Sequence, residues 1–164
     1  MIKKFKYSVF VYLSILPLVV LQLLSCGLFH KNSKPATKRV KMTIVAHQNL
    51  NESEPGVGHS VQVRFFLLKN AREFENIFDY HAVATDPIGT IGDDFIEEIE
   101  PPAYLLPAEK MEKIINASPE AEYLGVIASY SKPYNDIAKA WASLKKNKEL
   151  VLELQKDRIV LQDD

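Results

Sequence analysis

Apolar and polar residues alternate in two segments, 40–46 and 60–68, in the manner of strands that bury one face. The residues predicted to face the core are Val40, Met42, Ile44, Val61, Val63, Phe65 and Leu67. The 13 residues between these segments, 47–59, are rich in Asn, Ser, Glu, Pro and Gly, a composition typical of a loop. The pattern therefore predicts two strands joined by a long loop.

Residues 70–80 break the alternation and repeat instead at helical spacing. The apolar residues that share one helical face, at positions i, i+3 and i+4, are Phe74, Ile77 and Phe78. Asn70 can cap this helix, because Glu73 follows three residues later. The pattern predicts one short amphipathic helix whose aromatic stripe packs against the sheets.

The second half of the chain again has the character of strands. Residues 85–92 are rich in turn formers, and residues 93–100 fit a strand or a helix; we favour a strand in which Phe95 and Ile99 are buried. Further strands are predicted at 110–116, 122–130, 139–144, 150–155 and 158–162. Seven or eight short strands separated by turns predict an all-β fold, a two-sheet antiparallel β-sandwich with one short inserted helix.

Length and charge restrict the class of protein. A chain of 164 residues is long enough to bury a core without disulfides, and Cys26 is its only cysteine. The 20 basic and 21 acidic residues nearly balance, which gives no electrostatic basis for binding nucleic acid. We therefore expect a single β-sandwich domain over residues 40–164 and no nucleic-acid partner.

The N-terminus has the three-part layout of an export signal. Three lysines precede an apolar run, residues 9–24, which is followed by Ser25 and Cys26. The run has 16 residues and contains Pro17, whereas a helix needs about 20 residues to span a bilayer. We therefore predict that residues 1–25 are a cleaved lipoprotein signal peptide. The alternative is an uncleaved anchor helix with a free thiol at its end.

Residues 23–26, Leu-Leu-Ser-Cys, resemble the lipobox of bacterial lipoproteins. The resemblance implies that Cys26 becomes the N-terminus and carries a diacylglycerol group and an N-linked acyl chain such as palmitate. One acyl chain binds membranes only marginally, so several chains are needed for stable anchoring in lipid. Gly27, in place of an Asp, favours sorting to the outer membrane. Residues 26–39 then form a lipidated N-terminus and linker, and the mature chain has 17 basic and 21 acidic residues.

Candidate catalytic and metal-binding residues form no constellation in the sequence. The four histidines lack the spacing of metal ligands, and no Gly-x-Ser-x-Gly motif occurs. These histidines are His30, His47, His59 and His81. The acidic residues within 93–100 do not match a calcium-binding loop. We expect neither an enzyme nor a metal, a cofactor or a small-molecule substrate.

Two alternatives to a structural role remain open from the residues alone. A lipid-anchored enzyme could use the acidic residues between Asp93 and Glu100. A periplasmic ligand-binding lipoprotein of transthyretin-like fold would instead enclose a pocket between its sheets. The aromatic residues that could line this pocket are Tyr123, Tyr130, Tyr134 and Trp141.

Three stretches behind the lipobox resemble, in their order, the outer-membrane lipoprotein of the bacterial type VI secretion system, the TssJ/SciN family. They are residues 50–70, 74–80 with 91–95, and 121–144. The residues that carry the resemblance are Asn51, Leu68, Lys69, Phe74, Phe78, Gly92, Asp93, Gly125, Val126, Ala128, Tyr130 and Trp141. The chain departs from the family pattern at Ala108, where Gly often follows Pro, and at Ala142, where Arg is common.

The resemblance implies a sandwich with a helical addition, anchored in the outer membrane and facing the periplasm. It implies that the lipoprotein binds the periplasmic C-terminal region of the large inner-membrane protein TssM and so tethers the trans-envelope complex. In that family the loop between the first two strands makes this contact. The corresponding residues here are His47, Gln48, Asn49, Leu50, Asn51, Glu52, Ser53, Glu54, Pro55, Gly56, Val57, Gly58 and His59. Leu50 and Val57 are the apolar residues that we expect the loop to present.

Overall fold

The computed structural model describes residues 37–131, 137–145 and 149–163. The predicted signal peptide, Cys26, most of the linker and Tyr134 lie outside these residues. The strands are β1 (Lys38–Ala46), β2 (Val61–Leu68), β3 (Phe95–Glu98), β4 (Ala103–Leu105), β5 (Lys110–Ala117), β6 (Tyr123–Ala128), β7 (Ala138–Ser143), β8 (Glu149–Leu154) and β9 (Ile159–Asp163). The helices are α2 (Arg72–Glu75), α3 (Tyr80–Thr85), α4 (Pro87–Ile91) and the 3-10 turn Gly92–Asp94.

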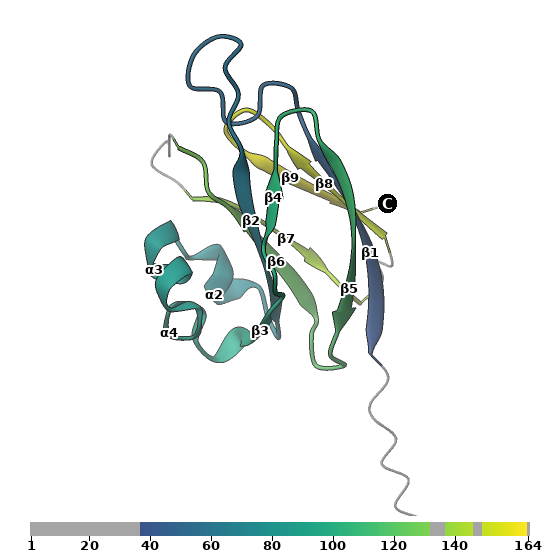
Figure 1. Ribbon diagram of the computed structural model, residues 1–164. Coiled ribbons are helices and arrows are strands. Elements are labelled where there is room, and N and C mark those ends of the chain that lie inside the picture. Colours follow the sequence, from purple (N-terminus) through teal and green to yellow (C-terminus); the bar gives the residue numbers. More distant parts are fainter. Residues whose placement is uncertain (1–36, 132–136, 146–148, 164) are drawn as a thin grey trace, which may run out of the picture. The chain divides into compact units, whose positions relative to one another are not determined.

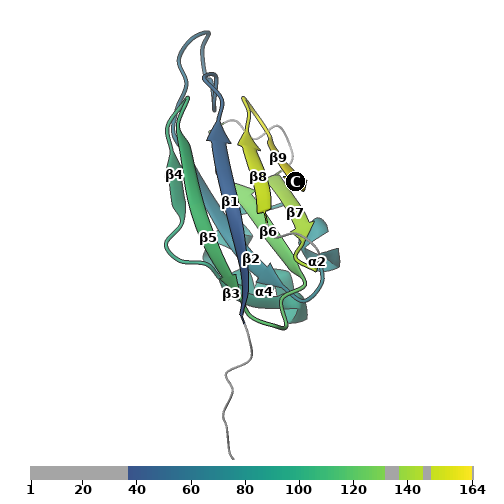
Figure 2. The ribbon, with the colours of Figure 1, turned by 90° about the vertical axis from the view of Figure 1, so that its right-hand side faces the viewer.

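The strands form two sheets that face each other (Figure 1). One sheet has the order β5-β1-β8-β9, and the other has the order β3-β2-β6-β7, with β4 also paired to β2. Figure 2 shows β1 between β5 and β8. The pair β1 and β8 is parallel, whereas β1 and β5 are antiparallel. The predicted β-sandwich is confirmed, with the correction that its first sheet is mixed.

Two short strands lie where the alternation of apolar and polar residues is least regular. β3 confirms a strand over 95–98 of the segment 93–100, whereas Asp93 and Asp94 belong to the 3-10 turn; both Phe95 and Ile99 are partly buried. β4 is absent from the predicted strands, because three residues after Pro101 and Pro102 are too few to show a period. The residues that the structure describes therefore contain nine strands rather than seven or eight.

The core between the sheets is built from the residues predicted to face it. All seven positions predicted on β1 and β2 are buried. Leu150, Leu152 and Leu154 of β8 join the same core. Each large apolar side chain removed from water contributes about 1.5–3 kcal/mol to folding. This core fixes the ends of β1 and β2, from which the long loop emerges.

The outer face of the sheet that contains β2 and β6 is covered by the helices (Figure 1). Phe66 and Leu68 of β2 point to this face and are buried there. The helical segment contributes Phe74, Ile77, Val83 and Ile91. Gly125 of β6 permits this close approach, because a Cβ at that position would lie 2.8 Å from the ring of Phe74. Burial of β2 on both faces explains the unbroken apolar run at 65–68.

The single helix predicted at 70–80 is interrupted. The side chain of Asp79 accepts hydrogen bonds from two backbone N–H groups and starts α3 afresh. The chain changes course after α2, so Phe78 does not join the aromatic stripe. Its side chain is 68% exposed, and the ammonium of Lys139 lies 4.8 Å from its ring centroid. The other two residues of the stripe are buried, as predicted.

Two further local predictions are corrected. Ala71 is the N-cap of α2, while Oδ1 of Asn70 accepts a hydrogen bond of 3.3 Å from the N–H of Arg72. Residues 85–92, predicted as turns, contain α4, because Pro87 begins a helix as readily as it begins a turn. No helix within the described part of the chain combines the length and the apolar character needed to cross a membrane.

Candidate functional site

The loop between β1 and β2, residues 47–60, lies at the end of the sandwich where β1 finishes (Figure 1). β1 begins at Lys38, at the opposite end of its sheet (Figure 2). This β1–β2 loop contains all 13 residues of the predicted binding site. The loop therefore lies at the opposite end of the domain from the point where the linker joins it.

The base of the β1–β2 loop is held by two buried residues. Leu50 is fully buried in the main core, so the expectation that it faces a partner is wrong. Asn51 is 6% exposed, and its Nδ2 donates to the carbonyl of Ser60 at 3.2 Å. Its Oδ1 accepts from the backbone N–H of Ser131 at 2.9 Å and from Ser131 Oγ at 2.8 Å. The base is thus attached to the core, to the start of β2 and to the segment after β6.

Glu52 connects the middle of the β1–β2 loop to the hairpin between β8 and β9. Its carboxylate accepts a hydrogen bond of 2.6 Å from the N–H of Gly56 and lies 2.8 Å from Nζ of Lys156. The hydrogen bond from Lys156, followed by that from Gly56, lowers the pKa of Glu52. Gly56 has a φ of 82°, in the left-handed region that favours glycine. The loop is therefore closed by an internal hydrogen bond and supported by an ion pair with the β8–β9 hairpin.

The tip of the loop, residues 53–59, is a small closed turn. The N–H of Val57 donates to the carbonyl of Glu54 at 2.9 Å, and the N–H of Ser53 donates to the carbonyl of Val57 at 3.2 Å. Ser53 Oγ and His59 Nε2 are 2.8 Å apart. The side chain of Val57 is 45% exposed. Of the two apolar residues that we expected the loop to present, Val57 is the one on the surface.

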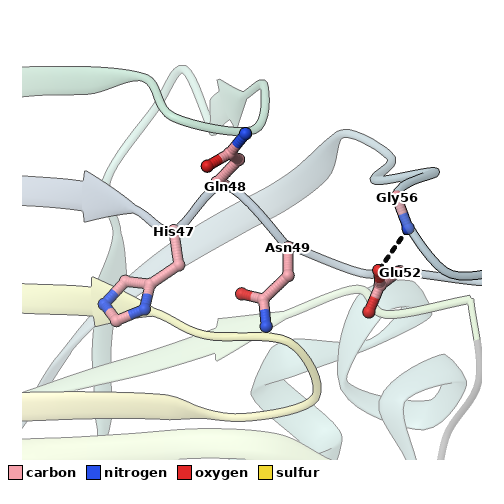
Figure 3. A pocket seen from close by; sticks show the side chains of 5 residues that line it. All are labelled: His47, Gln48, Asn49, Glu52 and Gly56. Carbon is pink, nitrogen blue, oxygen red and sulfur yellow. Dashed lines mark hydrogen bonds between the residues drawn. The ribbon is translucent and has the colours of Figure 1, made fainter.

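An open depression of about 410 Å³ lies beside the loop. The residues that line it are His47, Gln48, Asn49, Glu52 and Gly56 (Figure 3). His47 Nε2 is 3.7 Å from Oε2 of Glu153 on β8. Enclosed, mostly apolar cavities bind small molecules, whereas this depression is open and its surface is polar and apolar in similar measure.

The aromatic residues proposed to line a ligand pocket make packing contacts. The hydroxyl of Tyr130 lies 2.9 Å from the carbonyl oxygen of Arg158 and 3.1 Å from that of Gln155, and burial raises the pKa of Tyr130. Tyr123 and Trp141 pack edge to face with their ring centroids 5.6 Å apart. These three aromatic residues therefore stabilise strand contacts.

One of the acidic residues between Asp93 and Glu100 has a structural role. Glu98 forms a bidentate salt bridge with Arg64, in which Nε and Nη2 of Arg64 donate to Oε1 and Oε2 of Glu98, each at 2.6 Å. This hydrogen-bonded pair raises the pKa of Arg64. Within residues 37–131, 137–145 and 149–163, no three His, Cys, Asp or Glu side chains are grouped so as to hold a metal ion.

Three residues that support the loop come from distant parts of the chain. Ser131 and Lys156 make the hydrogen bonds described above. Pro107, in the turn after β4, is so close that a Cβ at Gly58 would lie 2.8 Å from its Cγ. The local sequence gives no signal for these residues, because each acts through a tertiary contact.

The family model described as type VI secretion lipoprotein, VasD, EvfM, TssJ, VC_A0113 matches residues 38–161. The chain belongs to this family of type VI secretion lipoproteins. The match extends from β1 into β9 and includes the whole β1–β2 loop. It confirms the resemblance identified in the sequence. No curated protein matches the chain.

Solved structures of type VI secretion proteins share the fold. TssJ1 from Pseudomonas aeruginosa is 22% identical, with a TM-score of 0.69 over 78% of this chain and 97% of that chain. Serratia marcescens Lip, a membrane-bound component of the system, is 15% identical, with a TM-score of 0.68 over 78% and 99%. A structure described as the TssM C-terminal domain from EAEC contains a chain that is 22% identical, with a TM-score of 0.64 over 77% and 99%.

Proposed function

We propose that this type VI secretion lipoprotein tethers a trans-envelope complex to the outer membrane. Acyl chains on Cys26 hold the mature chain in the lipid. The β1–β2 loop binds the periplasmic C-terminal region of a large inner-membrane protein of the TssM type. Family membership supports the role in secretion, and the similar chain in the structure described as the TssM C-terminal domain supports the choice of partner.

The observation that carries the proposal is the course of β1. Lys38 follows the linker, and Ala46 directly precedes the β1–β2 loop. A strand rises about 3.4 Å per residue, so the two ends of β1 are roughly 27 Å apart. One strand therefore separates the end of the linker from the surface offered to the partner. The body of the sandwich keeps the two at a fixed distance.

The β1–β2 loop has the properties of a protein-binding surface. Its base is buried and hydrogen-bonded, so little conformational freedom is lost when a partner binds. Its tip presents Val57 among polar neighbours, and interfaces commonly surround an apolar contact with a polar rim. The role that follows is structural, with the chain acting as a fixed point and not as a catalyst.

One experiment separates the two halves of the proposal. Cys26→Ser removes the acylation site and Val57→Asp places a charge at the loop tip; both variants are expressed in the secreting cell. We expect Cys26→Ser to leave the membrane fraction and to abolish secretion, while the purified chain still binds the partner's periplasmic region. We expect Val57→Asp to stay in the outer membrane but to bind the partner at least tenfold more weakly.

Ile114→Asp is the matched control, because Ile114 is 41% exposed on β5, outside the loop. It should leave both membrane attachment and partner binding unchanged. Outer-membrane recovery of Cys26→Ser would contradict the anchor. Equal loss of partner binding in Val57→Asp and Ile114→Asp would contradict the loop as the contact.

A further inference from the structure

Asn51 stands out because, among the described residues, it is the one polar residue that is buried. Its carboxamide oxygen has two lone pairs and accepts two hydrogen bonds, both from Ser131. Its amide group donates to the carbonyl of Ser60. A single side chain therefore connects the β1–β2 loop to the start of β2 and to a segment that lies 80 residues later in the chain.

The backbone at this position restricts the choice of residue further. Asn51 has a φ of 49°, in the left-handed region that Gly, Asn and Asp occupy most readily. Gly satisfies this backbone but makes none of the three hydrogen bonds. Asp can accept from Ser131 but cannot donate to Ser60, and a buried carboxylate is expensive to desolvate. Asn alone among these three meets both the backbone and the hydrogen-bonding requirements.

Asn51 also lies where the chain passes from the core to the surface. Leu50, immediately before it, is fully buried, and Glu52, immediately after it, pairs with Lys156. The three hydrogen bonds of Asn51 therefore set the direction in which the exposed tip leaves the domain. We propose that Asn51 is a positioning residue that holds the β1–β2 loop in its partner-binding conformation before the partner arrives. This inference rests on the proposed function.

The expected consequence is kinetic. With 6% of its surface exposed, Asn51 offers almost no contact area, so it affects binding through the conformation of the loop. If a variant holds the loop in the competent form for only a fraction of the time, the apparent affinity falls by that fraction. The association rate falls with it, while the dissociation rate of the formed complex is unchanged. A residue that contacts the partner directly would instead change dissociation.

The test uses Asn51→Gly in the mature acylated protein, held in detergent, with the purified periplasmic C-terminal region of the TssM-type protein as partner. Association and dissociation rates are measured on a surface. We expect Asn51→Gly to slow association about tenfold and to leave the dissociation rate within a factor of two. The matched control is Asn116→Gly, an exposed residue of β5 outside the loop, which should leave the association rate unchanged.

Two results would overturn the inference. One is an unchanged association rate in Asn51→Gly. The other is a faster dissociation with unchanged association, which would make Asn51 a contact residue. If the wild-type chain does not bind the partner at all, the proposed function fails. The inference is then judged on the free protein, where Asn51→Gly should speed amide exchange at Val57 and His59 at least tenfold, with β1 unaffected.

Ser131→Ala keeps the test decisive if Asn51→Gly fails to fold. This variant removes the hydroxyl donor but leaves the backbone N–H of residue 131 on Asn51 Oδ1. We expect association to slow two- to threefold, again without a change in dissociation. Identical association rates for Ser131→Ala and the wild-type chain would count against Asn51 as a positioning residue.

Discussion

The β1–β2 loop and the helical segment 70–94 are both long connections, but they are stabilised in different ways. The helical segment buries four large apolar side chains against the outer face of its sheet. The loop buries one, Leu50, and is otherwise held by hydrogen bonds of Asn51 and Glu52. Apolar burial is non-directional, whereas hydrogen bonds require a specific geometry. The helical segment therefore contributes stability, and the loop contributes a defined shape.

The two regions also differ in backbone strain. Within the described residues, the non-glycine residues with positive φ are Asn51 and Ala108, at 49° and 64°. Both lie at the loop end, where the N–H of Ala108 donates to the carbonyl of His47 at 3.3 Å. The helical segment uses Gly92, with a φ of 69°, for its own left-handed position. Strained backbone persists where neighbours hold it and is frequent at functional sites.

The largest expected effect belongs to the helical segment. Phe74→Ala should destabilise the domain by about 3–5 kcal/mol, because it leaves a cavity above Gly125 and beside Phe66. Urea unfolding measures this loss. The control Ile88→Ala, on a side chain that is 65% exposed, should change stability by less than about 0.5 kcal/mol. If folded Phe74→Ala also binds the partner more slowly, the separation of stability from loop shape is wrong.

A smaller effect, of opposite sign, is expected at the loop end. Ala108→Gly relieves the left-handed conformation and should stabilise the domain by about 1 kcal/mol. Thermal denaturation measures the gain. The same change at Ala140, in the middle of β7, should destabilise by about 0.5–1 kcal/mol, since glycine weakens a regular strand. A loss of stability in Ala108→Gly would show that the backbone at position 108 is not strained.

The smallest effect is a response of the loop to acid. The folded pKa of Glu52 lies below its usual value of 4.5. The bonds of Glu52 to Lys156 and Gly56 therefore contribute their full stability above pH 4.5, and this contribution is lost as the pH falls through the folded pKa. The amide resonance of Gly56 should therefore shift with a midpoint below 4.5. Glu52→Gln should abolish the transition. A midpoint at or above 4.5 would contradict the pairing.

The sequence predicts the strands well because one face of each is buried. All seven positions predicted on β1 and β2 lie in the core. The parallel pairing of β1 with β8 escapes such patterns, since the two strands come from opposite ends of the domain. Phe78 fits a helical period in the sequence, but Asp79 starts a new helix and leaves it exposed.

The candidate site is predictable in extent but not in detail. Composition identifies residues 47–59 as a loop, and the structure agrees within one residue at its far end. An isolated leucine in a polar stretch has no periodic neighbours, so the burial of Leu50 could not be read from the pattern. The same holds for Asn51, whose partner Ser131 is 80 residues away.

The course of β1 has a mechanical consequence. In the proposed arrangement, with a lipid anchor before Lys38 and a partner bound after Ala46, tension between them passes along the backbone of β1. A strand is extended to about 3.4 Å per residue, and a chain reaches at most about 3.6 Å, so it has almost no slack to give. β1 forms eight residue pairs with β5 and six with β8. These pairs lie beside the path of the tension, so the tension is not transmitted through them. Between the end of the linker and the loop, the domain then transmits tension through the backbone of β1 with almost no extension, while the neighbouring strands hold β1 in place.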